Sequence, residues 1–123
     1  MASEIKVEQR VSVLNGNLNF AYPPSGSSVA ADQTAAGGPT PGMMSVGTSE
    51  ESTAFPELGT LGWVILHNTD ATNYVQWGFS TAVYGGRMEA GEKAGPFRLE
   101  PGTTLYLKAN TAACLVLVAA FED

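Results

Sequence analysis

Four short runs of β-branched and aromatic residues in the second half of the chain most constrain its fold. They span residues 62–68, 74–80, 103–109 and 114–121, and each is bounded by Gly, Pro, Asn, Asp or Thr. Short apolar runs between turn-forming residues are typical of β-strands, and no helical periodicity extends beyond a turn or two. The run CLVLVAAF at 114–121 is apolar at odd and even positions, which predicts a central strand buried on both faces.

The N-terminal segment has the pattern of a β-hairpin. Residues 5–13 alternate apolar and polar side chains, as a strand with one wet face does. The Asn15-Gly16 dipeptide that follows is favoured in a two-residue type I′ turn, because both turn positions need positive φ. Residues 17–22 would form the returning strand. The sequence therefore predicts a hairpin over residues 1–22, as part of the same domain as the rest.

Residues 23–42 differ in composition from the rest of the chain. The stretch PPSGSSVAADQTAAGGPTPG has few large apolar residues and many Gly, Ala, Ser and Pro. Segments of this kind are usually disordered or become ordered on a partner. We expect a flexible or partner-ordered arm here, followed by a β-sandwich core over residues 43–123.

Seven to nine short strands separated by turns predict an all-β fold. We expect an antiparallel β-sandwich, jelly-roll-like, that carries the N-terminal hairpin and the long Gly/Ala/Pro-rich arm. The runs at 62–68 and 74–80 are expected to pair with each other across the turn between them. Alternation along the runs selects the expected core residues, which are Val11, Val13, Trp63, Ile65, Leu105, Leu107, Val116 and Val118.

The charge pattern argues against nucleic acid and membrane partners. Twelve acidic and six basic residues give a net charge of −6, and the basic residues are scattered along the chain. Nucleic-acid binding needs a clustered basic surface, so we expect no such partner. No apolar run is long enough to cross a bilayer, and the start MASEIKVEQR lacks the apolar segment of a secretory signal.

Residues that carry chemistry are sparse. His67 is the only histidine and Cys114 the only cysteine, and both lie inside apolar runs. A catalytic triad needs a histidine with a nucleophile and a carboxylate, and a cupin-type metal site needs several histidines. Glu50 and Glu51 are adjacent, so on a strand they point to opposite faces. We predict that the protein is not an enzyme and has no catalytic residue, cofactor or metal site.

Aromatic residues and prolines are the candidate contact residues. Trp77 and Phe79 share one face of their run, and Tyr84 stands beside Gly85-Gly86 in a loop. Two interpretations of Trp77 are open. Its side chain packs in the core, or it belongs to an exposed surface that stacks on sugars or binds a protein. The predicted interface residues are Pro23, Pro24, Val29, Pro39, Pro41, Trp77, Phe79 and Tyr84.

The second half of the chain also resembles a known class of proteins. The segments NTDATNYV at 68–75, AGE at 90–92, PGTTLYLKAN at 101–110 and AACLVLVAAFED at 112–123 are similar to turns and strands of small structural proteins of tailed bacteriophages. The resemblance covers about half the chain and consists of turn and core positions.

This resemblance implies a virion protein made in the host cytoplasm. The expected role is capsid decoration (cement), in which the protein binds the major capsid protein on the outside of the head and stabilises the shell. Self-association as a homodimer or homotrimer is also expected, because the edge strands of a sandwich need cover. The alternatives are a tail, neck or fibre component and a carbohydrate-binding β-sandwich module.

Overall fold

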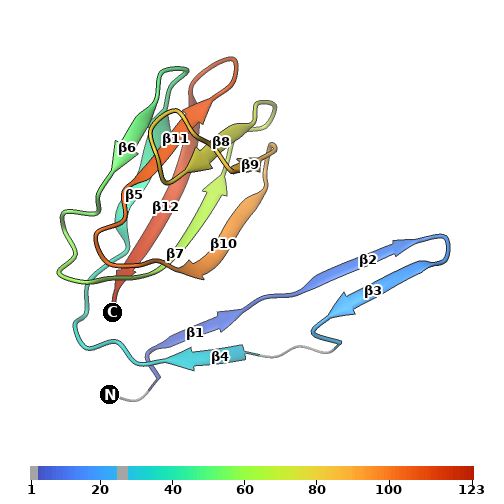
Figure 1. Cartoon of the computed structure of the whole chain (residues 1–123), viewed down its shortest axis with the longest axis horizontal. Helices are drawn as coiled ribbons and strands as arrows, with labels where there is room; N and C mark the ends of the chain where they lie inside the picture. Colours follow the sequence, from blue (N-terminus) through green and yellow to red (C-terminus); the bar gives the residue numbers. More distant parts are fainter. Residues whose placement is uncertain (1–2, 25–27) are drawn as a thin grey trace. The chain divides into compact units, whose positions relative to one another are not determined.

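The computed structural model describes residues 3–24 and 28–123, and the chain divides into two units, Met1–Thr34 and Ala35–Asp123. Every regular element in the described residues is a β-strand, and every strand pair is antiparallel (Figure 1). This confirms the prediction of an all-β, antiparallel fold. The strands are β1 (Ile5–Glu8), β2 (Val11–Asn15), β3 (Leu18–Tyr22), β4 (Ser28–Ala31), β5 (Thr40–Val46), β6 (Glu51–Thr53), β7 (Leu61–Asn68), β8 (Val75–Gly78), β9 (Gly86–Met88), β10 (Lys93–Arg98), β11 (Leu105–Ala109) and β12 (Cys114–Glu122).

The first unit consists of two two-stranded ribbons, β1 with β4 and β2 with β3. Part of the predicted hairpin is present as β2–β3, with its turn one residue later than predicted. Residues 5–8, expected in its first strand, instead form β1 and pair with β4. Asn15 pairs with Leu18, so Gly16 and Asn17 form the two-residue loop. Gly16 alone of these two has a positive φ, at 57°. Glycine at the first central position is typical of a type II′ turn, which needs only one left-handed residue.

The predicted arm over residues 23–42 is not confirmed. β4 falls inside it and pairs with β1 along its whole length. The first residues of β5 also fall inside it, and Thr40 pairs with Ala120 of β12. Strand pairing uses backbone groups that every residue except proline provides, so a segment with few large side chains can still form strands. Residues 25–27 of this segment lie outside the described residues.

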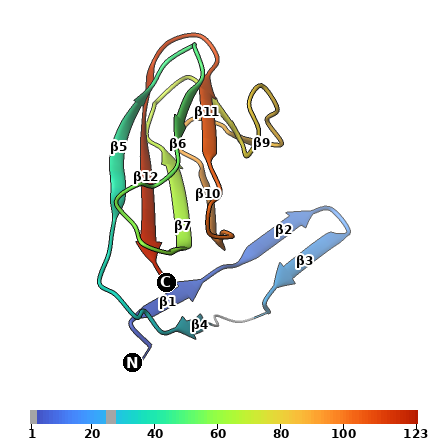
Figure 2. The same ribbon diagram turned by 60° about the vertical axis from the view of Figure 1, so that its left-hand side comes forward.

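The second unit is a sandwich of two four-stranded sheets with the strand orders β10-β7-β12-β5 and β6-β11-β8-β9 (Figure 2). The predicted pairing of the runs at 62–68 and 74–80 is wrong. β7 pairs with β10 and β12, whereas β8 pairs with β9 and β11 of the other sheet. The connection between β7 and β8 therefore carries the chain from one sheet to the other instead of closing a hairpin.

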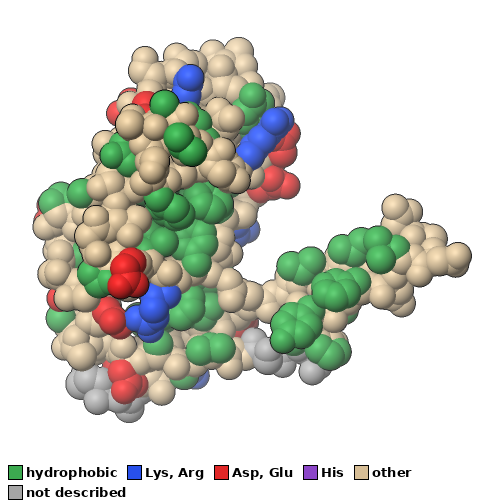
Figure 3. Space-filling model, in the orientation of Figure 1, with side chains coloured by type: hydrophobic (Ala, Val, Ile, Leu, Met, Phe, Trp, Pro, Cys, Tyr) green, Lys and Arg blue, Asp and Glu red, His purple; other side chains and the backbone are tan. Residues whose placement is uncertain are grey.

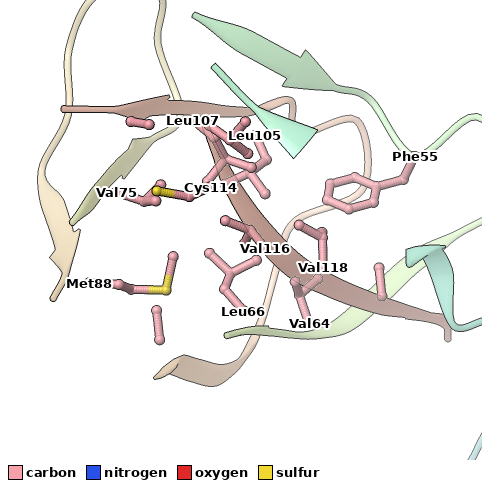
Figure 4. Close-up of a cluster of buried hydrophobic side chains, with 14 of the residues drawn as sticks. Phe55, Val64, Leu66, Val75, Met88, Leu105, Leu107, Cys114, Val116 and Val118 are labelled. Carbon is pink, nitrogen blue, oxygen red and sulfur yellow. The ribbon is translucent and has the colours of Figure 1, made fainter. Parts of the chain in front are cut away.

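Alternate residues from both sheets meet in one apolar core (Figure 4). The predicted core residues Leu105, Leu107, Val116 and Val118 are fully buried there, as the alternation of their strands requires. Cys114 joins them as a buried side chain. The further buried apolar members are Val46, Phe55, Leu61, Val64, Leu66, Val75, Met88, Ala94, Ala109 and Ala120.

The prediction of core residues is wrong for two pairs. Trp63 and Ile65 lie on the other face of β7 from Val64 and Leu66 and are only half-buried. Both faces of this strand are apolar, so its sequence could not indicate which face turns inward. Val11 and Val13 are exposed, because their two-stranded ribbon has no second layer within its unit.

Candidate interaction surfaces

The β2–β3 ribbon carries its large apolar side chains on one face. Val11 stands opposite Tyr22 and Val13 opposite Phe20, and directly paired residues project to the same side. Leu18, two positions before Phe20, shares this side. We call these five residues the ribbon face. Their exposed fractions run from 39% for Val13 to 69% for Tyr22.

Apolar exposure is concentrated in this small unit. Seven of the eleven large apolar side chains that are exposed in the described residues belong to residues 3–34. The ribbon therefore displays apolar side chains to solvent, and Figure 3 shows several of them along its visible side. Large contiguous apolar surfaces on soluble proteins are typical of sites that bind another macromolecule.

A hollow lies at the junction of the two ribbons of the first unit. It has a volume of about 380 Å³, and its lining includes Val7, Val11, Tyr22 and Val29. Arg10 stands at this hollow, where its Nε donates to the Pro23 carbonyl at 3.2 Å and its Nη2 to that of Pro24 at 3.1 Å. The hollow is thus a mainly apolar recess that shares Val11 and Tyr22 with the ribbon face.

An aromatic cluster forms a second apolar surface, on the sandwich. The ring centroids of Trp77 and Phe97 are 5.5 Å apart, and Phe79 lies 5.7 Å from Trp77. Trp77 and Phe97 pack against the core, whereas Phe79 is 43% exposed. Figure 3 shows hydrophobic side chains gathered on the visible side of the sandwich. Of the two interpretations of Trp77, packing in the sandwich agrees with its half-buried position.

Trp77 also lies against the backbone of Gly86 on the neighbouring strand. The two residues are paired across β8 and β9, and a Cβ atom added to Gly86 would stand 2.0 Å from the indole Cε2. Only glycine leaves room for the ring at this position. Sequence reasoning missed the role of Gly86, although Gly85-Gly86 beside a strand is a signal of close backbone approach.

Tyr84 is fixed by a carboxylate. Its hydroxyl donates to Glu50, and so do the Ala82 N–H and the Thr81 hydroxyl, both at 2.7 Å. These hydrogen bonds, that from Tyr84 foremost, lower the pKa of Glu50. The same bond to Glu50 raises the pKa of Tyr84 to about 12. Glu50 therefore orders the loop at residues 80–84, a structural role that the sequence did not reveal.

A buried amide anchors the crossing from β7 to β8. Asn68 is fully buried, and its Nδ2 donates to the carbonyls of Asn73, Met88 and Glu89 at 2.9, 3.1 and 3.3 Å. Its Oδ1 accepts from the Asp70 N–H at 3.1 Å. One side chain thus satisfies backbone groups of two segments, residues 70–73 and residues 88–89. Sequence reasoning treated Asn68 only as the end of a strand.

The predicted interface residues do not form one surface. Pro23, Pro24 and Val29 belong to the first unit, and Val29 is 61% exposed. Pro39 precedes β5 and Pro41 lies within it, and both are exposed. The structure brings Trp77 and Phe79 together in the aromatic cluster, and Pro23 and Val29 together at the hollow of the first unit. Whether these residues contact a partner stays a prediction.

The residues able to carry chemistry are dispersed. Within residues 3–24 and 28–123 no group of three or more His, Cys, Asp or Glu side chains is placed to hold a metal ion. His67 stands on the side of β7 that faces away from the core. Burial raises the pKa of the Cys114 thiol, whose Sγ donates to the Ala112 carbonyl at 3.5 Å. A thiol held protonated in this way is a poor nucleophile.

No family model, curated protein or solved structure matches this chain. The residues that the structure describes include no helix with the length and apolar character to cross a bilayer. The functional argument therefore depends on the surfaces themselves.

Proposed function

We propose that this protein is a non-enzymatic structural protein of a phage virion, a capsid decoration (cement) protein. It would bind the major capsid protein on the outer surface of the head and stabilise the shell. The observation that carries the proposal is the ribbon face, in which five apolar side chains project from a ribbon that has no covering layer in its own unit. The phage resemblance of the second half of the chain supports the same assignment.

The strand order of the sandwich supports a jelly-roll body for this role. Counted from β5, one sheet holds the first, eighth, third and sixth strands, and the other holds the second, seventh, fourth and fifth. Two interlocked Greek keys produce this alternation, which is the plan of the eight-stranded jelly roll found in many capsid domains.

The physical basis of the proposed stabilisation is mass action. A ligand that binds the assembled shell and not its separated subunits raises the free energy of disassembly. Full burial of one Val, Leu or Phe side chain contributes about 1.5–3 kcal/mol before ordering is subtracted. The ribbon face holds five large apolar side chains that are already partly ordered by strand pairing, so docking it immobilises little additional chain.

The test is to add purified protein to phage heads assembled without it and to measure bound protein by sedimentation. We expect binding by the natural sequence, and an increase in the temperature at which the heads release their contents. The double variant Val13→Ser, Phe20→Ser should lose most binding, because it removes two neighbouring side chains of the ribbon face. The matched control is Leu14→Ser on the opposite side of β2, where the side chain is 80% exposed.

The outcomes separate this role from its alternatives. Equal head binding by both variants would contradict docking through the ribbon face, and absence of head binding would contradict the cement role. Binding only to tails would favour the tail, neck or fibre alternative. The sugar-stacking alternative has no supporting observation, because Trp77 packs against Gly86 and Phe97 and the Tyr84 hydroxyl is engaged with Glu50.

A further inference from the structure

We propose that the outer face of the β10-β7-β12-β5 sheet is the surface through which two copies of this chain associate. The outer face is the side of this sheet that points away from the core. In the dimer, the outer faces of two sandwiches would pack against each other around a two-fold axis. The inference is independent of shell binding and concerns the free protein.

The outer face is apolar along its centre. Leu117 of β12 pairs with Met43 of β5 on one side and His67 of β7 on the other. Leu115 lies two residues along β12, and Leu115 and Met43 are 55% and 53% exposed. The neighbouring row holds Ile65, which pairs with Ala119. β12 therefore carries apolar side chains on both faces, and on the outer face Leu115 is largely exposed.

Association by strand addition is obstructed at the edges of the sandwich. β5 and β10 are the edge strands of this sheet. β5 contains Pro41, and β10 contains Pro96 and a register shift between Ala94 and Phe97. The edge strands of the other sheet, β6 and β9, have only three residues each. Proline, bulges and short strands are the usual obstacles to edge pairing, so a face is the surface left for self-association.

The distribution of charge is compatible with a two-fold pair. Lys93 of β10 lies beside His67, and Arg98 of β10 pairs with Trp63, so the basic side chains lie at the β10 edge. The outward residues of β5 and β12 near Met43 are neutral. A two-fold axis parallel to the strands places the β10 edge of one copy over the β5 edge of the other. Like charges are then kept apart, which a self-complementary interface requires.

The size of the face predicts a reversible dimer. β5 is seven residues long and the sheet has four strands. At about 3.3 Å per residue and about 4.8 Å between strands, its footprint is roughly 20 by 23 Å. Two such footprints bury on the order of 900 Å² in total, close to the ~1,000 Å² that a stable specific interface needs. We therefore expect a dimer that dissociates on dilution.

The test is sedimentation velocity of the full chain over a concentration series, without phage particles. We expect a monomer–dimer equilibrium for the natural sequence and a shift of at least tenfold toward monomer for Leu115→Glu and for Met43→Glu. The control is Val83→Glu, because Val83 is 63% exposed in a loop connected to the other sheet. Melting temperatures equal to that of the natural chain, measured at concentrations where the natural chain is monomeric, would show that the variants fold. A folded Leu115→Glu or a folded Met43→Glu is sufficient for the test.

Three results would overturn the proposal. The natural chain could remain monomeric at the highest concentration. The Leu115→Glu and Met43→Glu variants could also dimerise as well as the natural chain does. Alternatively, Phe20→Ser could abolish dimerisation while Met43→Glu does not, which would assign self-association to the ribbon face. None of these results depends on whether the protein binds heads.

Discussion

At the scale of single residues, the Asn68 side chain links the connection between β7 and β8 to residues 88–89 at the end of β9. It is fully buried yet its side chain makes four hydrogen bonds, so its removal takes a donor away from the buried Met88 carbonyl. Leaving a buried polar group without a hydrogen-bond partner costs more free energy than the bond itself contributes to stability.

We predict that Asn68→Ala lowers the free energy of unfolding by about 3 kcal/mol, because the buried carbonyl of Met88 loses its Asn68 donor and the other side-chain bonds of Asn68 are lost with it. Urea denaturation followed by tryptophan fluorescence measures this. The control Asn110→Ala should cost less than about 1 kcal/mol, since Asn110 is exposed. Equal losses for both variants would contradict the anchoring role.

Gly86 offers a second test at this scale. Gly86→Ala should lower the free energy of unfolding by about 1–3 kcal/mol, because the new methyl group would overlap the Trp77 indole. The matched control is Gly85→Ala, which has no atom within 4 Å of the added Cβ. Denaturation curves that are the same for the two variants would show that Trp77 does not depend on Gly86.

The pH dependence of the Glu50 loop follows from the direction of its pKa. Because the folded state lowers the pKa of Glu50 below 4.5, its contribution to stability is full above pH 4.5 and is lost as the pH falls through the lowered value. Tyr84 acts at the other end, where its contribution is full below pH 10 and is lost as the pH approaches 12.

The measurement is the amide chemical shift of Ala82 during acid titration. We expect it to move below pH 4.5 as the carboxylate that accepts its N–H is protonated. Glu50→Gln should remove this transition and leave other acid transitions in place. A transition that persists in Glu50→Gln would assign it to a different carboxylate.

At the scale of elements, the ribbon and the sandwich differ in how each strand is supported. β12 pairs on both sides and buries Val116 and Val118, whereas β2 has one partner strand and exposes Val11 and Val13. Isolated two-stranded ribbons are marginal in water, while a central strand opens only with the whole domain.

We predict that amides of β2 and β3 in the free chain exchange with solvent at least ~100-fold faster than those of β12. Hydrogen exchange followed by NMR or mass spectrometry measures the difference. Addition of heads should slow exchange in the ribbon if the ribbon face is the docking surface. Equal protection of β2 and β12 in the free chain would contradict the marginal stability of the ribbon.

At the scale of the whole molecule, the ribbon face and the outer face both carry exposed large apolar side chains. A sandwich that self-associates through its outer face gains stability from association, and this gain depends on protein concentration.

We therefore predict that the melting temperature of the free chain rises with protein concentration, by a few degrees across the range in which the dimer forms. Calorimetry at several concentrations measures this. In Met43→Glu the melting temperature should be independent of concentration. A concentration-independent value for the natural chain would contradict coupling between folding and association.

Local patterns predicted much of the architecture. Alternation placed Leu105, Leu107, Val116 and Val118 in the core, and turn residues located the hairpin to within one position. They failed where both faces of a strand were apolar, as in β7, and where a hairpin had no second layer. They also failed at Asn68, whose partners lie up to 21 residues away along the chain.

The amino-acid order by itself determined that the chain forms short antiparallel strands, because periodicity and turn chemistry act between near neighbours. Only the tertiary structure decided that β7 and β8 belong to different sheets, that Val64 and not Trp63 turns inward, and that Val13 lies uncovered. These outcomes depend on which distant segments pack together. The free energy of such packing arises from contacts between residues far apart in the chain, which no local pattern encodes.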